Sequence, residues 1–444
     1  MSESLLSVGL DVGTTSTQLV VSRLTVENRA SSFAVPDMDI TERNVLYKSP
    51  VYFTPLLDER HVDGTGIREI VQAEYQKAGI RREDVDTGAI IITGETSRKE
   101  NARAVLEALS DYAGDFVVAT AGPDLESVLA AKGAGAVELS RTAGKPVLHM
   151  DIGGGTSNLA LIEDGKITRT GCLNVGGRLI KFRENGEITY VSSVLSGIFS
   201  GKPGEIATQA ELRELAQSLT QTLEMAAGLR EPTQLMEKLL TEETGRKWNP
   251  PAGEVIISFS GGVADCMAEE LPWNQFGDLG PILGQTIRKS RLCRGQYALG
   301  RETIRATVIG AGSYSTQLSG STVYSQNVRF PLKNLPVVEK NSELYEGSVV
   351  LSVPGITSPT YAQVREIARE LAQTQPPELY ICLEADMAKA LGQALAARLP
   401  PETRILCIDR IRVGENSYLD IGQPVGGAFP VVVKTLVLER SKHE

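Results

Sequence analysis

The sequence has few of the residues that build metal centres, catalytic triads and disulfide frameworks. It contains only 3 histidines and 5 cysteines in 444 residues. The cysteines are scattered, odd in number and without a Cys-x-x-Cys pair, so we expect reduced thiols in a cytoplasmic protein. The histidines His61, His149 and His443 are too dispersed to predict a histidine-built zinc site or a triad.

Positive charge and long apolar runs are also scarce. The formal net charge is −10, which argues against nucleic acid as a partner because few cations are left to neutralise phosphates. No apolar stretch approaches the length of a membrane span, and we expect neither a signal peptide nor a membrane partner. A length of 444 residues with 41% hydrophobic residues predicts a globular protein of two to four domains.

One glycine-rich stretch in the middle of the chain carries the strongest signal. It reads Asp151-Ile152-Gly153-Gly154-Gly155-Thr156, with apolar residues before and after it. An acidic residue that ends one apolar strand, followed by glycines, a hydroxyl residue and a second apolar strand, predicts a hairpin whose turn contacts a phosphate. Glycine matters there because a side chain would hold an anion away from the backbone N–H groups.

The N-terminus holds a near copy of this stretch, Asp11-Val12-Gly13-Thr14-Thr15, again between apolar strands. A single such hairpin can be an ordinary tight turn, but the recurrence indicates two related halves that clamp one nucleotide. The pattern is not a P-loop, because no Gly-Lys-Ser/Thr follows. It is not a dinucleotide fingerprint either, because the glycines open a strand and not a helix. Asp11 is placed to hold a hydrated magnesium ion beside the phosphates.

Three further segments fit a nucleotide-binding protein. Residues 122–136 and 303–312 predict helices of small residues that end in glycine and can cross at short range, which would make a hinge between the halves. The turn Gly261-Gly262-Val263 follows a buried strand and leaves room for adenine or ribose against the backbone. Taken alone, the helix at 122–136 is better explained as an Ala-rich core helix, and the Gly261-Gly262 turn is equally well explained as a simple strand-to-helix turn.

The rest of the chain reads as α/β. Apolar periodicity predicts helices at 66–78, 99–109 and 209–240, and Gly79 is placed to end the first. Residues 316–345 are rich in Ser, Gly and Pro and predict a crossing segment. Residues 349–408 then predict a compact β-α-β-α-β unit without a catalytic motif.

In this order, the five nucleotide motifs resemble the superfamily of ATPases that contains actin, hexokinase and the seventy-kilodalton heat-shock proteins. The resemblance covers about residues 5–320. It implies an α/β fold with two ribonuclease-H-like lobes that hold a nucleotide between them, and an additional C-terminal α/β subdomain. The expected domains are residues 1–145, the first lobe, 146–325, the second lobe, and 326–444, the crossing segment and subdomain.

The resemblance also implies roles for individual residues. Asp11 and Asp151 would act on magnesium through water and serve the reaction. A carboxylate at the start of the first connecting helix would orient the attacking water: counting nine back from Gly133 gives Asp124, with Glu126 as the alternative. The residues expected to contact the nucleotide are Gly13, Thr14, Thr15, Gly153, Gly154, Gly155, Thr156, Gly261, Gly262 and Val263.

Within that superfamily the sequence resembles the ethanolamine ammonia-lyase reactivating factors. LHMDIGGGTSNLALIEDG, ISFSGGVADC and ATVIGAGSYSTQLSGSTVY are among the phrases that carry the likeness along nearly the whole chain. It implies a chaperone-like ATPase that uses ATP, or ADP after turnover, with Mg²⁺. Its partner would be ethanolamine ammonia-lyase, from which damaged cobalamin is released in exchange for adenosylcobalamin. A cytoplasmic location and association with a bacterial microcompartment are expected from the resemblance alone.

Three other functions are open from the sequence. A small-molecule kinase of the same superfamily would need an acceptor pocket with a catalytic base, and no convincing motif for one is present. An actin-like, polymer-forming scaffold would use the same nucleotide motifs. A corrinoid carrier is less well supported, because the sequence lacks an Asp-x-His-x-x-Gly ligand motif.

Overall fold

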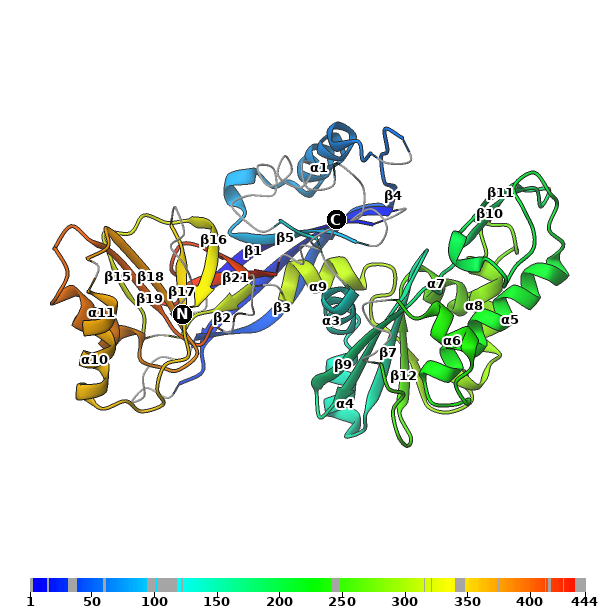
Figure 1. Ribbon diagram of the computed structural model, residues 1–444. Coiled ribbons are helices and arrows are strands. Elements are labelled where there is room, and N and C mark those ends of the chain that lie inside the picture. The colour runs from blue at the N-terminus through cyan, green and yellow to red at the C-terminus, as the bar shows by residue number, and fades with distance from the viewer. Residues whose placement is uncertain are drawn as a thin grey trace, which may run out of the picture.

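The computed structural model describes most of the chain. They form three larger sheets, which Figure 1 shows side by side, and a two-stranded hairpin. Of the described helices, none is both long and apolar enough to cross a membrane. The described residues are 3–13, 16–30, 38–58, 61–93, 101, 118–120, 123–241, 248–314, 316–320, 322–339, 348–373, 375–411, 413, 417–425 and 427–435.

The first sheet is mixed and has the order β3-β2-β1-β5-β6, with β4 added beside β2. Its first strand pairs antiparallel with β2 and parallel with β5. Apolar residues that alternate along β1, such as Val8 and Leu10, pack with Ile67 of helix α1. The elements are β1 (Glu3–Val12), β2 (Ser16–Asn28), β3 (Met38–Lys48), β4 (Tyr52–Phe53), α1 (Gly64–Ala78), β5 (Thr87–Ile92) and β6 (Val118–Thr120).

The second sheet repeats this arrangement. Its order is β13-β12-β7-β8-β9. Strand β7 lies between antiparallel β8 and parallel β12, just as β1 lies between antiparallel β2 and parallel β5. The predicted pair of ribonuclease-H-like lobes is therefore confirmed. The elements are β7 (Val147–Ile152), β8 (Ser157–Glu163), β9 (Lys166–Leu173), β12 (Ile256–Ser260) and β13 (Tyr297–Leu299).

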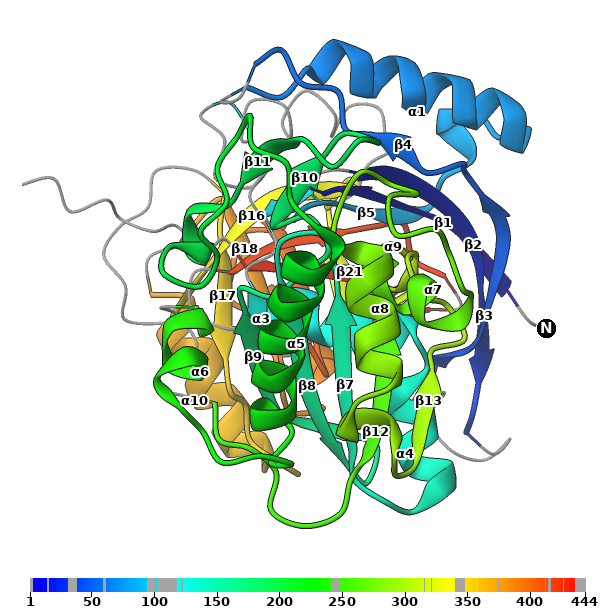
Figure 2. The ribbon, with the colours of Figure 1, turned by 90° about the vertical axis from the view of Figure 1, so that its right-hand side faces the viewer.

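Helices cover both faces of the second sheet. One face packs against α5 (Gln209–Ala226), α7 (Gly262–Ala268) and α8 (Gly280–Arg288), which lie in front of the strands in Figure 2. The other face packs against α3 (Pro123–Gly133) and α4 (Ala136–Ala143) through small residues such as Ala131 and Ala160. The hairpin of β10 (Ile180–Phe182) and β11 (Ile188–Val191) extends the same lobe.

The predicted helix at 209–240 is two helices. The first, α5, ends at Ala226, and α6 (Gln234–Leu239) begins eight residues later. Gly228 follows α5 with φ of 73°, a left-handed conformation that glycine adopts without strain and that ends a helix. Leu229 continues the apolar spacing of α5 past this glycine but is 38% exposed. Apolar residues continue at helical spacing between α5 and α6, so the sequence did not reveal where α5 ends.

The two lobes exchange helices where they meet. Helix α3 follows the first sheet but lies on the second, where Ser127 Oγ donates to the carbonyl of Gly171 at 3.2 Å. Helix α9 (Ala306–Tyr314) follows the second sheet but lies on the first, and a Cβ on Gly9 of β1 would come within 2.5 Å of the Val308 carbonyl oxygen. Both helices lie at the centre of Figure 1, between the two sheets.

Glycine makes the crossing of α3 and α9 possible. A Cβ on Gly133 would lie 1.9 Å from the carbonyl oxygen of Ala306, and a Cβ on Gly310 would lie 2.1 Å from that of Leu129. Neither position has room for a side chain, because the opposing atoms belong to the backbone. The predicted crossing of two small-residue helices is confirmed, and its action as a hinge stays a prediction.

The third sheet has eight strands in the order β14-β21-β20-β16-β17-β18-β19-β15. Its parallel part is the predicted β-α-β-α-β unit, which is confirmed. The elements are β14 (Thr316–Leu318), β15 (Tyr324–Gln326), β16 (Leu332–Glu339), β17 (Val350–Val353), α10 (Tyr361–Leu371), β18 (Glu378–Leu383), α11 (Ala388–Ala396), β19 (Arg404–Ile408), β20 (Ser417–Ile421) and β21 (Pro430–Thr435).

The described part of segment 316–345, predicted as a crossing segment, forms β14, β15 and β16, and β14 and β15 lie at opposite edges of the third sheet. A domain boundary at 325/326 falls inside β15. The third sheet is also tied to the lobes, since Val432 packs with Ile91 of β5 and Ala311 of α9. The division into three domains stays a prediction, and the predicted helix at 99–109 lies outside the described residues apart from 101.

We expect Gly310→Ala to destabilise the protein by about 2 kcal/mol, because the added methyl group would force α3 and α9 apart. Urea unfolding followed by circular dichroism measures the change. Gly295→Ala is the matched control, since a Cβ there meets no atom within 4 Å. A Gly310→Ala variant as stable as this control would contradict the close approach of the helices.

Candidate functional site

The two acidic hairpins are closed by equivalent backbone hydrogen bonds. In the first, Gly13 N–H donates to the carbonyl of Ser16 at 2.9 Å, and in the second, Gly153 N–H donates to that of Thr156 at 2.9 Å. Residues 153–156 are partly exposed, and a Cβ on Gly155 would meet no atom within 4 Å. Packing therefore does not require glycine at 155. The absence of a side chain leaves the backbone N–H groups accessible, as an anion site needs.

The loop that contains Gly176 and Gly177 binds the second hairpin through backbone hydrogen bonds. Gly177 N–H donates to the Gly153 carbonyl at 2.9 Å, and Arg178 N–H donates to the Gly154 carbonyl at 2.6 Å. A Cβ on Gly176 would lie 2.3 Å from the same Gly154 oxygen. These bonds occupy the carbonyl groups of the hairpin and fix the orientation of its peptides.

The aspartates at the ends of β1 and β7 are buried. Asp11 is 8% exposed and accepts a bond from Thr93 Oγ1 at 2.9 Å. Asp151 is 7% exposed and accepts bonds from Ser260 Oγ and, at 3.4 Å, from Thr307 Oγ1 of α9. The second aspartate is thus bound both by its own sheet and by the helix that crosses to the other lobe.

Burial changes the acidity of both groups. Loss of hydration raises the pKa of Asp11 to about 8, and the charges of Glu126 and Asp151 raise it further against the opposing bond from Thr93. Burial raises the pKa of Asp151 to about 6, against the bonds from Ser260 and Thr307. Two carboxylates from different lobes and one from α3 therefore share one electrostatic environment, in which negative charge is disfavoured without a cation.

Behind Asp151 lies a buried hydrogen-bond chain that begins at Ser258. Burial lowers the pKa of His149 to about 3, so its ring is neutral. Its Nε2 lies 2.9 Å from Ser260 Oγ and its Nδ1 lies 3.1 Å from Ser258 Oγ. Because Ser260 gives its only proton to Asp151, Nε2 must donate and Nδ1 must accept, which fixes the tautomer.

The two candidate carboxylates of α3 occupy different surroundings. Glu126 is buried at 7% exposure and accepts a bond from Asn158 Nδ2 at 2.9 Å, on the strand that pairs with β7. Asp124 is exposed and accepts a bond from Thr170 Oγ1. The charge that acts on Asp11 comes from Glu126. The structure therefore brings Glu126 to the two aspartates and places Asp124 on another face of the helix.

The predicted adenosine turn lies beside the second hairpin. Gly261 has φ of 84°, and a Cβ there would lie 2.3 Å from the carbonyl oxygen of Ile152 at the end of β7. Gly262 is partly exposed, whereas Val263 is 2% exposed and packs into the core of the second lobe. The turn is thus next to the hairpin as expected, with Gly262 more accessible than Val263.

Comparison with known proteins identifies the family. The sequence profile described as "Ethanolamine utilisation protein EutA" matches residues 3–348 and 340–439. The chain is 38% identical to the ethanolamine ammonia-lyase reactivase EutA of Salmonella typhimurium, over 97% of this chain and 98% of that protein. The chain belongs to the EutA family. The reactivase EutA of Escherichia coli is 37% identical over the same shares of the two chains.

Solved structures that resemble this EutA family member share less sequence identity with it than the two reactivases do. A Ppx/GppA family member from Aquifex aeolicus matches with a TM-score of 0.43 and 14% identity, over 69% of this chain and 97% of that one. EutJ from Carboxydothermus hydrogenoformans matches with a TM-score of 0.33 and 18% identity, over 70% and 89%.

Two features of this EutA family site were missed by sequence reasoning. His149 was set aside because histidines are few, yet His149 and Asp151 alternate on β7 as Ser258 and Ser260 do on β12, which places all four on one face of a parallel pair. The second is the loop at Gly176, whose close approach to Gly154 depends on the folded structure. Thr14 and Thr15 lie outside the described residues.

Proposed function

We propose that this protein is an ATP-dependent, chaperone-like reactivase of cobalamin-dependent ethanolamine ammonia-lyase. The observation that carries the proposal is membership of the EutA family along nearly the whole chain, where both curated relatives are named as reactivases of that lyase. The paired acidic hairpins supply a place for the nucleotide. The protein would release damaged cobalamin from the lyase so that adenosylcobalamin can bind.

The nucleotide would lie between the lobes, with its phosphates on both hairpins. Gly13, Thr14 and Thr15 would contact them from the first lobe, and residues 153–156 from the second. Gly261 and Gly262 would face the adenosine, with Val263 shaping the turn from the core. Each contact is to backbone or hydroxyl groups, which suits a ligand whose charge is spread over many oxygens.

Magnesium fits the carboxylates through water. Asp11 and Asp151 are buried and have raised pKa values, so a nearby dication would stabilise the ionised form of each. Among the described residues, no three acidic, histidine or cysteine side chains are grouped closely enough to enclose a metal. Mg²⁺ retains several of its waters in such sites and, when bound, would neutralise charge on the phosphates.

We assign the orientation of the attacking water to Glu126 in preference to Asp124. The carboxylate of Glu126 is buried, faces the hairpin of β7 and β8 through Asn158, and acts on Asp11. Such a group needs to accept a hydrogen bond from water at a fixed position, and phosphoryl transfer depends mainly on such positioning. Ser260, held by His149, would keep Asp151 in place during the reaction.

Coupling to the lyase would come from the crossing helices. A nucleotide that contacts both lobes changes the balance between lobe arrangements only to the extent that it binds one of them better. Because α3 and α9 join the lobes through backbone contacts, a change of lobe angle must pass through them. A cytoplasmic location and microcompartment association belong to this proposal and rest on resemblance alone. No observation favours a kinase or a scaffold.

We expect Glu126→Gln to lower the rate of ATP hydrolysis on the order of 10²-fold while nucleotide binding remains, because the amide cannot accept a proton or orient water equally well. The matched variant Asp124→Asn should change the rate less than about threefold. Release of inorganic phosphate measures both. The reverse ranking would return the role to Asp124.

The reactivase function is tested directly with inactivated ethanolamine ammonia-lyase. Incubation with this protein, ATP, Mg²⁺ and adenosylcobalamin should restore lyase activity, and omission of ATP should prevent the recovery. Replacing ATP by a non-hydrolysable analogue separates nucleotide binding from hydrolysis. If activity does not return in the complete mixture, the proposed function is wrong.

A further inference from the structure

A hollow between α3, α4 and β9 of the second lobe carries an unusual charge. Its volume is about 540 Å³, within the range of ligand and peptide sites. Its lining includes four cationic side chains and no carboxylate, although the whole chain has a net charge of −10. We call it the basic basin, and its lining residues are Val128, Lys132, Val137, Arg141, Gly165, Lys166, Ile167, Thr168, Arg169 and Thr170.

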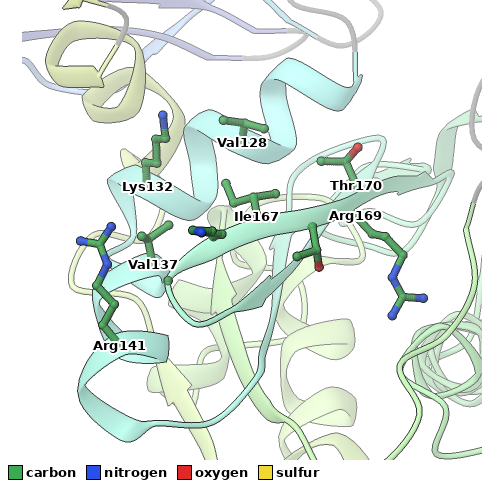
Figure 3. Close-up of a pocket in the computed structure, with 10 residues that line it drawn as sticks. Val128, Lys132, Val137, Arg141, Ile167, Arg169 and Thr170 are labelled. Carbon is green, nitrogen blue, oxygen red and sulfur yellow. The ribbon is translucent and has the colours of Figure 1, made fainter. Parts of the chain in front are cut away.

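The basin combines an apolar floor with a cationic rim. Val128 of α3, Val137 of α4 and Ile167 of β9 lie toward its middle in Figure 3. Lys132, Arg141 and Arg169 extend from the surrounding elements in different directions and do not meet at one point. A single phosphate requires convergent donors, whereas an extended chain with several carboxylates can meet cations that are spread apart.

The nearby carboxylates leave much of this positive charge unneutralised. Arg141 lies 3.8 Å from Glu138, a pair exposed on both sides and therefore weak. Glu163 and Asp124 accept bonds from Thr168 and Thr170. Within the described part of the chain, Lys132 and Lys166 make no ion pair. Burial and the charge of Arg43 lower the pKa of Lys132, so an added carboxylate would be favoured there.

The basin shares a helix with the nucleotide site. Asp124, Val128 and Lys132 are spaced by four residues and lie on one face of α3, toward the basin. Glu126 lies on another face, toward Asp151, and Gly133 contacts α9. A ligand that moves α3 from the basin side would therefore act on both the carboxylate and the crossing.

We infer that the basic basin docks an acidic segment of the ethanolamine ammonia-lyase. This inference rests on the proposed function and adds the surface through which it would work. The floor takes an apolar side chain of that segment, and the rim takes its carboxylates. Such charge pairs at an open surface mainly accelerate association and set the choice of partner. Because binding and nucleotide state act on the same helix, each should change the other.

The test reverses charge at two exposed rim residues, Arg141→Glu with Lys166→Glu, in the full-length protein. The matched control, Arg365→Glu with Lys389→Glu, makes the same change of net charge on exposed sites of α10 and α11. Association with purified, inactivated lyase is followed by biolayer interferometry. The basin variant should associate about tenfold more slowly at low salt, and the difference should shrink near 0.5 M NaCl because salt screens exposed charges.

The control should associate like the unaltered protein, and both variants should hydrolyse ATP normally without lyase. If the basin variant associates as fast as the control while the unaltered protein reactivates the lyase, the docking inference is wrong and the proposed function stands. If the unaltered protein neither binds nor reactivates the lyase, both are wrong. If 1 mM inorganic phosphate abolishes binding to the lyase while a glutamate-rich peptide does not compete, the basin is a small-anion site and the inference is overturned.

Discussion

The contact of α3 with α9 through their glycines is the constraint on which the rest of the structure depends. Each helix leaves one sheet and packs on the other, so the two lobes cannot separate without breaking this crossing. The closest approaches, Gly133 to Ala306 and Gly310 to Leu129, are between backbone atoms. Because the opposing atoms belong to the backbone, neither glycine can be replaced without moving one helix away from the other.

The candidate site depends on the crossing for its electrostatics. Thr307 of α9 donates to Asp151 of the second lobe, and Glu126 of α3 acts on Asp11 of the first. The buried carboxylates therefore come from both lobes and from α3, and α9 contributes the hydroxyl that binds one of them. Burial raises the pKa of Asp11 and of Asp151, so a cation beside these two carboxylates would favour their ionised forms.

Much of this could be predicted from the sequence, because local patterns carried it. The repeated Asp-x-Gly hairpins and the small-residue helices are short-range signals, and they led to the two lobes, the crossing and the aspartates. Other features depend on tertiary context. The proposed preference for Glu126 over Asp124 rests on the face of α3 that meets β8, which counting from Gly133 does not reveal. The end of α5 at Ala226 was hidden by apolar residues that continue past it. Strands within 316–345 pair with strands far along the chain, such as Tyr324 of β15 with Cys407 of β19, and local composition does not reveal such partners.

The central claim is that two acidic hairpins from opposite lobes hold one magnesium-bound nucleotide. Isothermal titration calorimetry of the full-length protein with ADP, with and without Mg²⁺, tests it most directly. The account predicts one site per chain, tighter with Mg²⁺, and loss of that magnesium dependence in both Asp11→Asn and Asp151→Asn. Magnesium-dependent binding that survives in both variants, or no binding of nucleotide at all, would contradict it.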